Sequence, residues 1–226
     1  ATTDDHFYIG SISKSFGATV NLKLIEQGKF ALNDSVKSIV PEFAEIFPQY
    51  SNYTPADLMG MQTLVPDFLN NPDGFLANIT ADPNHRFTIQ QIISFAMKDY
   101  PVKLPANYAE ELVMMNKTLE DFGIDTYFEY STTNFLAMEY IAETVTGQSM
   151  QDLVSSVVTS PLGLGNTVLP LRDAPEGVLP EPVSHTYFGK SCVHEINKYG
   201  GNASVGDRND EFVDSVVNFG SGGSMY

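Results

Sequence analysis

The sequence has little cysteine and little positive charge. Cys192 is the only cysteine in 226 residues, so no disulfide can form within the chain. This thiol is either a small buried side chain or the partner of a cysteine on another chain. Twelve Lys and Arg stand against 28 Asp and Glu, which gives a net charge of −16. Because phosphate binding needs a basic patch, this balance argues against a nucleic-acid partner.

Long apolar runs, a leader segment and metal-ligand pairs are also missing. No run approaches the ~20 apolar residues that cross a bilayer, so we expect no membrane span. The chain starts at Ala1 without a signal peptide, which indicates either a mature form or a fragment. We expect neither a metal nor another cofactor, because the histidines show no ligand spacing. They are His6, His85, His185 and His194.

What the sequence does contain is a Ser-x-x-Lys motif near its start, formed by Ser11 and Lys14. A three-residue offset puts both side chains on one helical face, about 5–6 Å apart at Cβ. A serine at a helix N-terminus lies near the positive end of the helix dipole, which stabilises negative charge. The same field and partial burial favour a neutral lysine amine, which can accept the serine proton. The alternative is that these residues simply begin a helix.

The surrounding pattern predicts mainly helices. The motif is expected to follow a short strand at Phe7–Gly10 and to open a helix whose buried stripe is Phe16, Val20 and Leu24. Further helices are predicted after the cap Thr54, over Phe87–Met97 with Thr88 as cap, and over Asn134–Val145 with Gly147 as stop. Residues 66–86 hold several Pro, Asn, Asp and Gly, and residues 161–190 are rich in Pro and Gly, which favours irregular structure in both.

Two segments carry a resemblance to a known family. Ile9–Phe43 closely resembles the active-serine segment of the serine β-lactamase and penicillin-binding protein superfamily. Its branch of class C β-lactamases, D-Ala-D-Ala carboxypeptidases and esterases is the most similar. Phe128–Ser149 resembles the family's Tyr-x-Asn loop and the helix after it. The resemblance implies an α+β, β-lactamase/transpeptidase-like fold, in which helices flank an antiparallel sheet and a helical subdomain is added.

The match also predicts how the chain is organised. Residues 1–226 are expected to form an incomplete β-lactamase-like domain. Residues 1–50 would hold the strand and helix of the active serine, 51–165 a mainly helical half, and 166–226 an irregular segment returning towards the sheet. Residues 217–226 resemble a glycine-rich turn of the family, but the Lys/His-Thr/Ser-Gly strand motif has no match here. We therefore expect a second polypeptide, such as the C-terminal part of a cleaved precursor, to complete the fold.

The resemblance implies a serine hydrolase that acts through an acyl-enzyme. Its substrate would be a small molecule or peptide with an ester, amide or β-lactam bond. Ser11 would be the nucleophile and its backbone N–H one oxyanion donor, with Lys14 as general base. Tyr130 would pass a proton to the leaving group. Thr132 and Asn134 are the residues expected to contact substrate.

Two departures from the family pattern bear on activity. Thr132 stands where the family has asparagine, and a hydroxyl cannot hold an amide as both donor and acceptor at the same reach. We therefore expect activated esters to react faster than β-lactams or D-Ala-D-Ala peptides, unless Asn134 takes over the vacant role. Met61, Thr63 and Leu64 replace a His-x-Ser-Gly at the site entrance. A catalytically silent relative used for binding is the alternative reading.

Asn-x-Ser/Thr sequons are more frequent than this composition gives by chance. They lie at Asn33, Asn52, Asn78, Asn116 and Asn202. Asn52 is the poorest of them, because Pro55 follows its Thr54. The excess predicts a glycosylated protein that is secreted or extracytoplasmic in a eukaryote.

Overall fold

The computed structural model describes residues 4–63, 65–69, 78, 86–97, 128 and 130–170, and the backbone of residues 70, 187–188 and 206–207. Several sequence predictions fall outside the described residues. These are the sequons at Asn116 and Asn202, the thiol of Cys192, the histidines His85, His185 and His194, the position of Leu64 and the segment 217–226.

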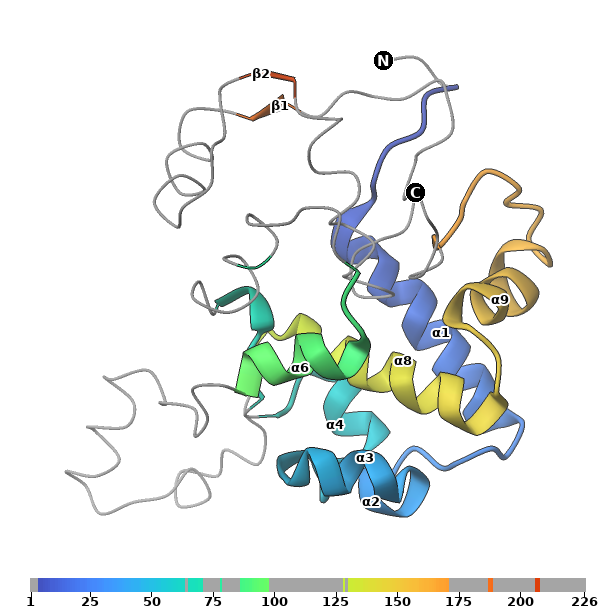
Figure 1. Cartoon of the computed structure of the whole chain (residues 1–226). Helices are drawn as coiled ribbons and strands as arrows, with labels where there is room; N and C mark the ends of the chain where they lie inside the picture. The colour runs from blue at the N-terminus through green and yellow to red at the C-terminus, as the bar shows by residue number, and fades with distance from the viewer. Residues whose placement is uncertain are drawn as a thin grey trace.

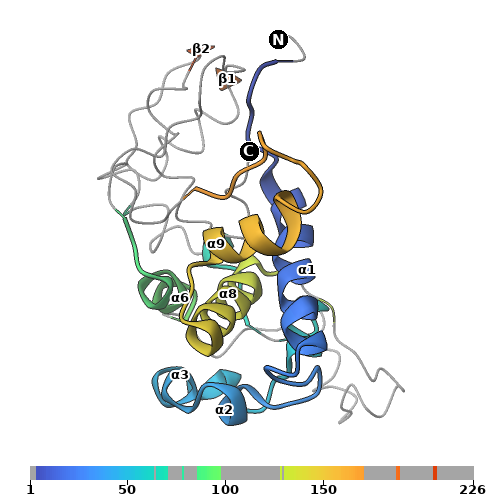
Figure 2. The ribbon, with the colours of Figure 1, turned by 90° about the vertical axis from the view of Figure 1, so that its right-hand side faces the viewer.

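Helix α8 (Thr132–Thr146) lies in the middle of the described residues (Figure 1). It packs against α1 (Ser13–Glu26), α4 (Pro55–Met59), α6 (Ile89–Met97) and α9 (Met150–Val154). Figure 2 shows α8 between α6 and α1, with α9 above it. Because neighbours cover α8 on several sides, nearly all of its first eleven residues are buried. This helix is the centre of the core.

The sequence correctly predicts most of these helices from their apolar period and caps. The helix over Asn134–Val145 is confirmed, although it begins two residues earlier, and Gly147 ends it with a φ of +67°. Helix α6 buries the predicted face Ile89, Ile92, Ile93 and Ala96. Thr88 caps it, because the Thr88 hydroxyl accepts from the Gln91 N–H at 3.2 Å.

Helix α1 also follows the predicted pattern, but the strand before it is wrong. Val20 and Leu24 are buried, and Phe16 packs partly buried against the core. Residues 7–9 have no regular structure, and Gly10 opens a short 3-10 turn, η1 (Gly10–Ile12). Gly10 has a φ of +54°, which lies outside the β region. The chain therefore turns into the helix instead of running up to it as a strand.

An aromatic cluster packs against Tyr140 in the second half of α8. It comes from the short helices α2 (Val36–Ile39) and α3 (Pro41–Ile46) and the 3-10 turn η2 (Pro48–Tyr50). The ring of Phe43 lies 5.3 Å from that of Tyr50 and 4.7 Å from that of Tyr140 on α8. Edge-to-face and tilted contacts of this kind add to the burial of the rings.

Helix α4 is short and fixed at both ends. Thr54 and Asp57 form a reciprocal capping box at its start, as the sequence predicts for Thr54. At its end the Gln62 N–H donates to Asp57 O and the Met61 N–H to Leu58 O, which is a Schellman arrangement. Met61 occupies the left-handed position of this motif, with a φ of +54°, where glycine is usual. The chain leaves α4 towards the start of α8.

The remaining elements are smaller. A 3-10 turn, η3 (Phe68–Asn70), contacts α6 and α8, and α9 continues into a π-helical turn, η6 (Ser155–Thr159). Strands β1 (Tyr187–Phe188) and β2 (Gly206–Asp207) pair antiparallel, with Tyr187 opposite Asp207. Within the described residues this pair is the only sheet, so the described part is mainly helical. The larger sheet of the expected α+β fold stays a prediction.

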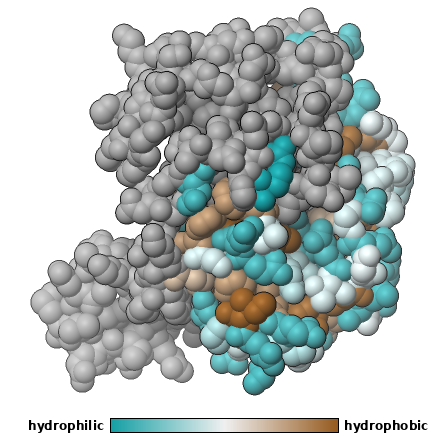
Figure 3. All heavy atoms as spheres, in the orientation of Figure 1, coloured by the Kyte–Doolittle hydropathy of each residue, from teal (hydrophilic) through white to brown (hydrophobic). Residues whose placement is uncertain are grey.

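The described surface mixes polar side chains with separate apolar areas (Figure 3). Ile12, Ile46 and Leu162 are among the large exposed apolar residues, and they come from three different segments. Scattered apolar residues of this kind are normal on a protein surface. None of the helices in the described residues combines the length and apolarity required to span a bilayer.

Candidate active site

The Ser-x-x-Lys pair lies at the start of α1. Ser11 is exposed within η1, and Lys14, the second residue of α1, is only 7% exposed. The Lys14 Nζ donates to the Ser11 Oγ at 3.2 Å. The helical offset therefore places the two side chains together, as the sequence predicts.

Tyr130, on the chain just before α8, reaches the same point. Its phenol oxygen lies 2.5 Å from the Ser11 Oγ, and either oxygen can be the donor. The Lys14 Nζ also lies 4.9 Å from the centre of the Tyr130 ring and 5.7 Å from that of Phe135. Ser11, Lys14 and Tyr130 thus form one hydrogen-bonded group.

Opposing effects act on the ionisation of Tyr130. Partial burial by itself raises its pKa, but hydrogen bonds from Lys14 and Ser11 and the charge of Lys14 act the other way. The net result is a Tyr130 pKa below its ordinary value. The negative charge of Asp67 works against this lowering. The site therefore favours the phenolate more than water does.

Thr132 and Asn134, the two predicted substrate contacts, are both buried but have different hydrogen-bond partners. Thr132 is the first residue of α8, and its Oγ1 accepts from the Lys14 Nζ at 3.4 Å. Asn134 is completely buried, and its Oδ1 accepts from the Thr63 hydroxyl at 2.9 Å. Its Nδ2 has no hydrogen-bond partner among the described residues. The structure therefore brings Thr132 into the group with Ser11 and leaves Asn134 in the core.

The segment 63–69 lies against the first turn of α8. It contains Thr63, which replaces the serine of the family's entrance motif and bonds to Asn134. The Phe68 N–H donates to the Thr133 Oγ1 at 2.9 Å, and the same hydroxyl donates to Pro66 O at 2.8 Å. These hydrogen bonds fasten the segment to the start of α8.

Asp67 is a residue of this site that sequence reasoning missed. It is 4% exposed, and its Oδ2 accepts from the Thr132 N–H at 3.0 Å. A carboxylate at this position satisfies one of the free N–H groups at the helix N-terminus. The only sequence signal is one charged residue in an apolar stretch, because Val65, Pro66 and Phe68 surround it.

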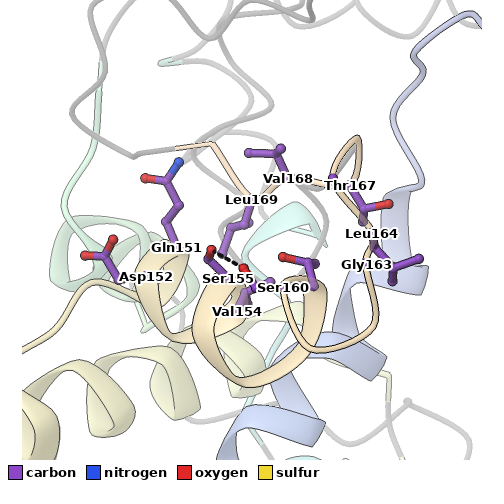
Figure 4. Close-up of a pocket in the computed structure, with 12 residues that line it drawn as sticks. Gln151, Asp152, Val154, Ser155, Ser160, Gly163, Leu164, Thr167, Val168 and Leu169 are labelled. Atoms are coloured by element: carbon purple, nitrogen blue, oxygen red, sulfur yellow. Dashed lines mark hydrogen bonds between the residues drawn. The ribbon is translucent and has the colours of Figure 1, made fainter.

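A cavity of about 520 Å³ lies elsewhere in the structure. Its walls come from α9, η6 and the turn that follows, and Figure 4 shows Gln151, Ser155 and Leu169 pointing towards it. The hydroxyls of Ser155 and Ser160 lie 3.4 Å apart in its wall. The cavity is lined by none of the four residues of the group, Ser11, Lys14, Tyr130 and Thr132, so it is separate from the candidate active site.

Known proteins are similar to this chain in sequence and in fold. A protein of Escherichia coli K12 named a putative D-alanyl-D-alanine carboxypeptidase is 28% identical over 196 residues, which are 82% of this chain and 38% of that protein. An unguisins hydrolase of Aspergillus campestris is 27% identical over 175 residues, which are 76% of this chain and 29% of that one. The chain thus spans less than half the length of these curated relatives.

Solved structures give the same result for the fold. A D-stereospecific amidohydrolase from Streptomyces has a TM-score of 0.69 at 25% identity, over 99% of this chain and 57% of that one. A D-amino acid amidase from Ochrobactrum anthropi has a TM-score of 0.70 at 20% identity, over 100% of this chain and 54% of that one. The fold is thus that of serine β-lactamases and transpeptidases.

The family assignment follows from the sequence match and agrees with the site. The family model described as Beta-lactamase matches residues 1–179, which include Ser11, Lys14, Tyr130 and Thr132. Its relatives include proteins named as carboxypeptidases, amidases and hydrolases. The chain belongs to the beta-lactamase family.

Proposed function

We propose that this protein is a serine hydrolase that forms an acyl-enzyme on Ser11. One observation carries the proposal: the Ser11 Oγ lies within hydrogen-bond reach of both Tyr130 Oη and Lys14 Nζ. An alcohol needs a neighbouring base to become a nucleophile, and a base in turn needs a group that orients it. Here Thr132 bonds to Lys14, and Lys14 bonds to Ser11. The arrangement meets both requirements.

The proposed reaction has two acyl-transfer steps. The Ser11 Oγ loses its proton and bonds to the substrate carbonyl carbon, and the bond to the leaving amine or alcohol then breaks. The leaving group takes up the proton, which leaves an ester between Ser11 and the acyl group. Water attacks this ester, returns the proton to Ser11 and releases the acid. Negative charge on the carbonyl oxygen develops near the N-terminus of α1, where the helix dipole favours it.

Two groups can accept the serine proton. The sequence assigns this role to Lys14, and that assignment stays a prediction. Two observations favour Tyr130 as the immediate acceptor: its oxygen is nearer to the Ser11 Oγ than the Lys14 Nζ is, and its pKa is lowered. In this version Lys14 holds the phenolate and Tyr130 passes the proton to the leaving group.

The substrate class we propose is a carboxylic ester or amide of a small molecule or peptide. The names of the carboxypeptidase, amidohydrolase and amidase relatives support acyl compounds with D-amino acids as the first set to test. Thr132 favours esters over amides, because its one hydroxyl already accepts from Lys14. A D-amino acid ester and the matching amide therefore form the most informative pair.

The acyl-enzyme is tested by intact mass after treatment with a fluorophosphonate. We expect one adduct on the wild type and none on Ser11→Ala. Ser15→Ala is the matched control, because Ser15 is exposed on the same helix and its hydroxyl donates only to a backbone carbonyl, Ile12 O. Equal labelling of Ser11→Ala, or no labelling of a folded wild type, would contradict the proposal. The second outcome would favour a binding protein.

The proposed reaction also needs a strand with the Lys/His-Thr/Ser-Gly motif, which the 226 residues do not contain. We propose that a second polypeptide carries it. Native and denaturing mass spectrometry of protein from its natural source tests this. We expect a second peptide that copurifies with the chain. A labelled, active chain without any other peptide would contradict it.

A further inference from the structure

A buried carboxylate connects two parts of the candidate site that lie far apart in the sequence. The Asp67 Oδ2 accepts from the Thr132 N–H at 3.0 Å, and its Oδ1 accepts from the Leu69 N–H at 3.1 Å. A buried carboxylate is costly unless hydrogen bonds satisfy it. Both oxygens of Asp67 have such a bond, so the side chain is fixed on both sides.

The residue that Asp67 holds is at the centre of the site. The N–H of Thr132 belongs to the first turn of α8, and the hydroxyl of the same residue accepts from Lys14. Tyr130 lies two positions earlier, on the chain that enters this turn. A shift in the start of α8 would therefore move the phenol and the Thr132 hydroxyl together relative to Ser11.

Asp67 also acts by its charge. The charged groups that act on Tyr130 are Lys14 of α1, which favours the phenolate, and Asp67 of the segment 63–69, which opposes it. In a partly buried site such opposing charges are screened less than in water. Substitution of Asp67 by a neutral residue should therefore lower the pKa of Tyr130 further.

We propose that Asp67 is a positioning residue that holds Tyr130 and Thr132 against Lys14 and Ser11 by fixing the first turn of α8. This proposal rests on the proposed function, because the position of Tyr130 and Thr132 affects catalysis only if Ser11 is the nucleophile. Its charge effect is measured without any turnover, so the two proposals can fail separately.

Two variants separate the charge of Asp67 from its hydrogen bonds. Asp67→Asn removes the charge and keeps an acceptor for the Thr132 N–H. Asp67→Ser is also neutral but is too short to keep both bonds. Asp57→Asn is the matched control, because Asp57 caps α4 in the same way, with its Oδ2 accepting from the Thr54 N–H at 2.8 Å.

The first readout is an ultraviolet pH titration of Tyr130, taken as the difference between each protein and the same protein with Tyr130→Phe. We expect Tyr130 to titrate at lower pH in both Asp67 variants and to be unchanged in Asp57→Asn. The second readout is the rate of fluorophosphonate labelling at the pH where Tyr130 is fully ionised. We expect a loss of about ten-fold or more in Asp67→Ser and a smaller loss in Asp67→Asn.

Three results would overturn the proposal. The first is a Tyr130 titration that does not move in either Asp67 variant. The second is an equal shift in Asp57→Asn, which would indicate a general effect of charge. The third is loss of the native near-ultraviolet circular dichroism in both Asp67 variants, because Asp67 would then serve the whole fold and not the site.

Discussion

The hydroxyl oxygens of Ser11 and Tyr130 lie 2.5 Å apart, although 119 positions separate the two residues in the sequence. Ser11 belongs to the turn that opens α1, and Tyr130 to the chain that enters α8. The contact of α1 with α8 brings them together. The hydrogen bonding of the Ser11 hydroxyl therefore depends on how one helix packs against another.

Labelling of Ser11 should depend on pH through Tyr130. Because the Tyr130 pKa is lowered, its phenolate forms below the pH at which free tyrosine ionises, and the labelling rate should fall as pH drops through that pKa. Lys14→Met removes a hydrogen bond and a positive charge, which raises the Tyr130 pKa. The fall in labelling rate should then occur at higher pH. Rates of fluorophosphonate labelling between pH 5 and 11 measure the shift. If the rate falls over the same pH range in Lys14→Met as in the wild type, Lys14 does not lower the pKa of Tyr130.

Thr132→Asn should change substrate preference more than overall activity. Asparagine offers both a donor and an acceptor to a substrate amide, whereas an ester needs less help of this kind. We expect the ratio of amide to ester turnover to rise by roughly ten-fold. Initial rates on a D-amino acid amide and its ester give this ratio. A parallel rise or fall on both substrates would remove Thr132 as the reason for the preference.

Asn134→Ala should act on stability and not on preference. Asn134 is buried in α8 and accepts from Thr63, so the substitution removes a hydrogen bond within the core. We expect the free energy of unfolding to fall by about 1–3 kcal/mol, measured by urea titration, with the amide-to-ester ratio unchanged. A changed ratio at unchanged stability would show that Asn134 contacts substrate after all.

Leu136→Ala should destabilise the protein strongly. Leu136 is completely buried in the middle of the core, on the helix that carries Thr132. Removal of its side chain leaves a cavity, for which the expected cost is about 2–5 kcal/mol in the free energy of unfolding. Leu22→Ala is a matched control on α1, because Leu22 is half exposed and should cost far less. Similar costs for the two variants would contradict this description of the core.

Glycosylation at the sequons stays a prediction. Asn33, Asn52 and Asn78 are exposed in the structure, so all three are open to a sugar. Mass spectrometry of tryptic peptides from the natural source, before and after removal of N-linked sugar, tests them. We expect sugar on Asn33, which lies in a turn, and the least on Asn52. Unmodified asparagine at every sequon would remove the argument for an extracytoplasmic protein.

The sequence predicts what is local in this protein. The helices α1, α6 and α8 follow from an apolar period of about four residues and from caps such as Thr88, all of which lie within a few positions of one another. The pair Ser11 and Lys14 is local for the same reason. The strand predicted at Phe7–Gly10 is wrong because the positive φ of Gly10, where the chain turns into the helix, leaves no trace in the apolar pattern.

The part that the sequence could not predict is made of distant contacts. The Asp67 carboxylate binds the Thr132 N–H across 65 positions, and no period or motif relates the two. The same holds for Asn134. Its residue type suits a substrate contact, but its position in the first turns of α8 makes it a hydrogen-bond partner of Thr63. Such roles follow only from how α8 packs against the segment 63–69.

The central place of α8 has a consequence for the newly made chain. Ser11 and Lys14 can meet as soon as the first turns of α1 form, but the phenol of Tyr130 and the hydroxyl of Thr132 arrive only when α8 docks on α1. Contacts between such distant parts of a chain form late in folding. In the proposed mechanism the serine thus remains an ordinary alcohol during synthesis until residues beyond 130 have left the ribosome. If the proposed labelling is observed, reactivity towards a fluorophosphonate will be a property of the folded chain and a measure of its folding.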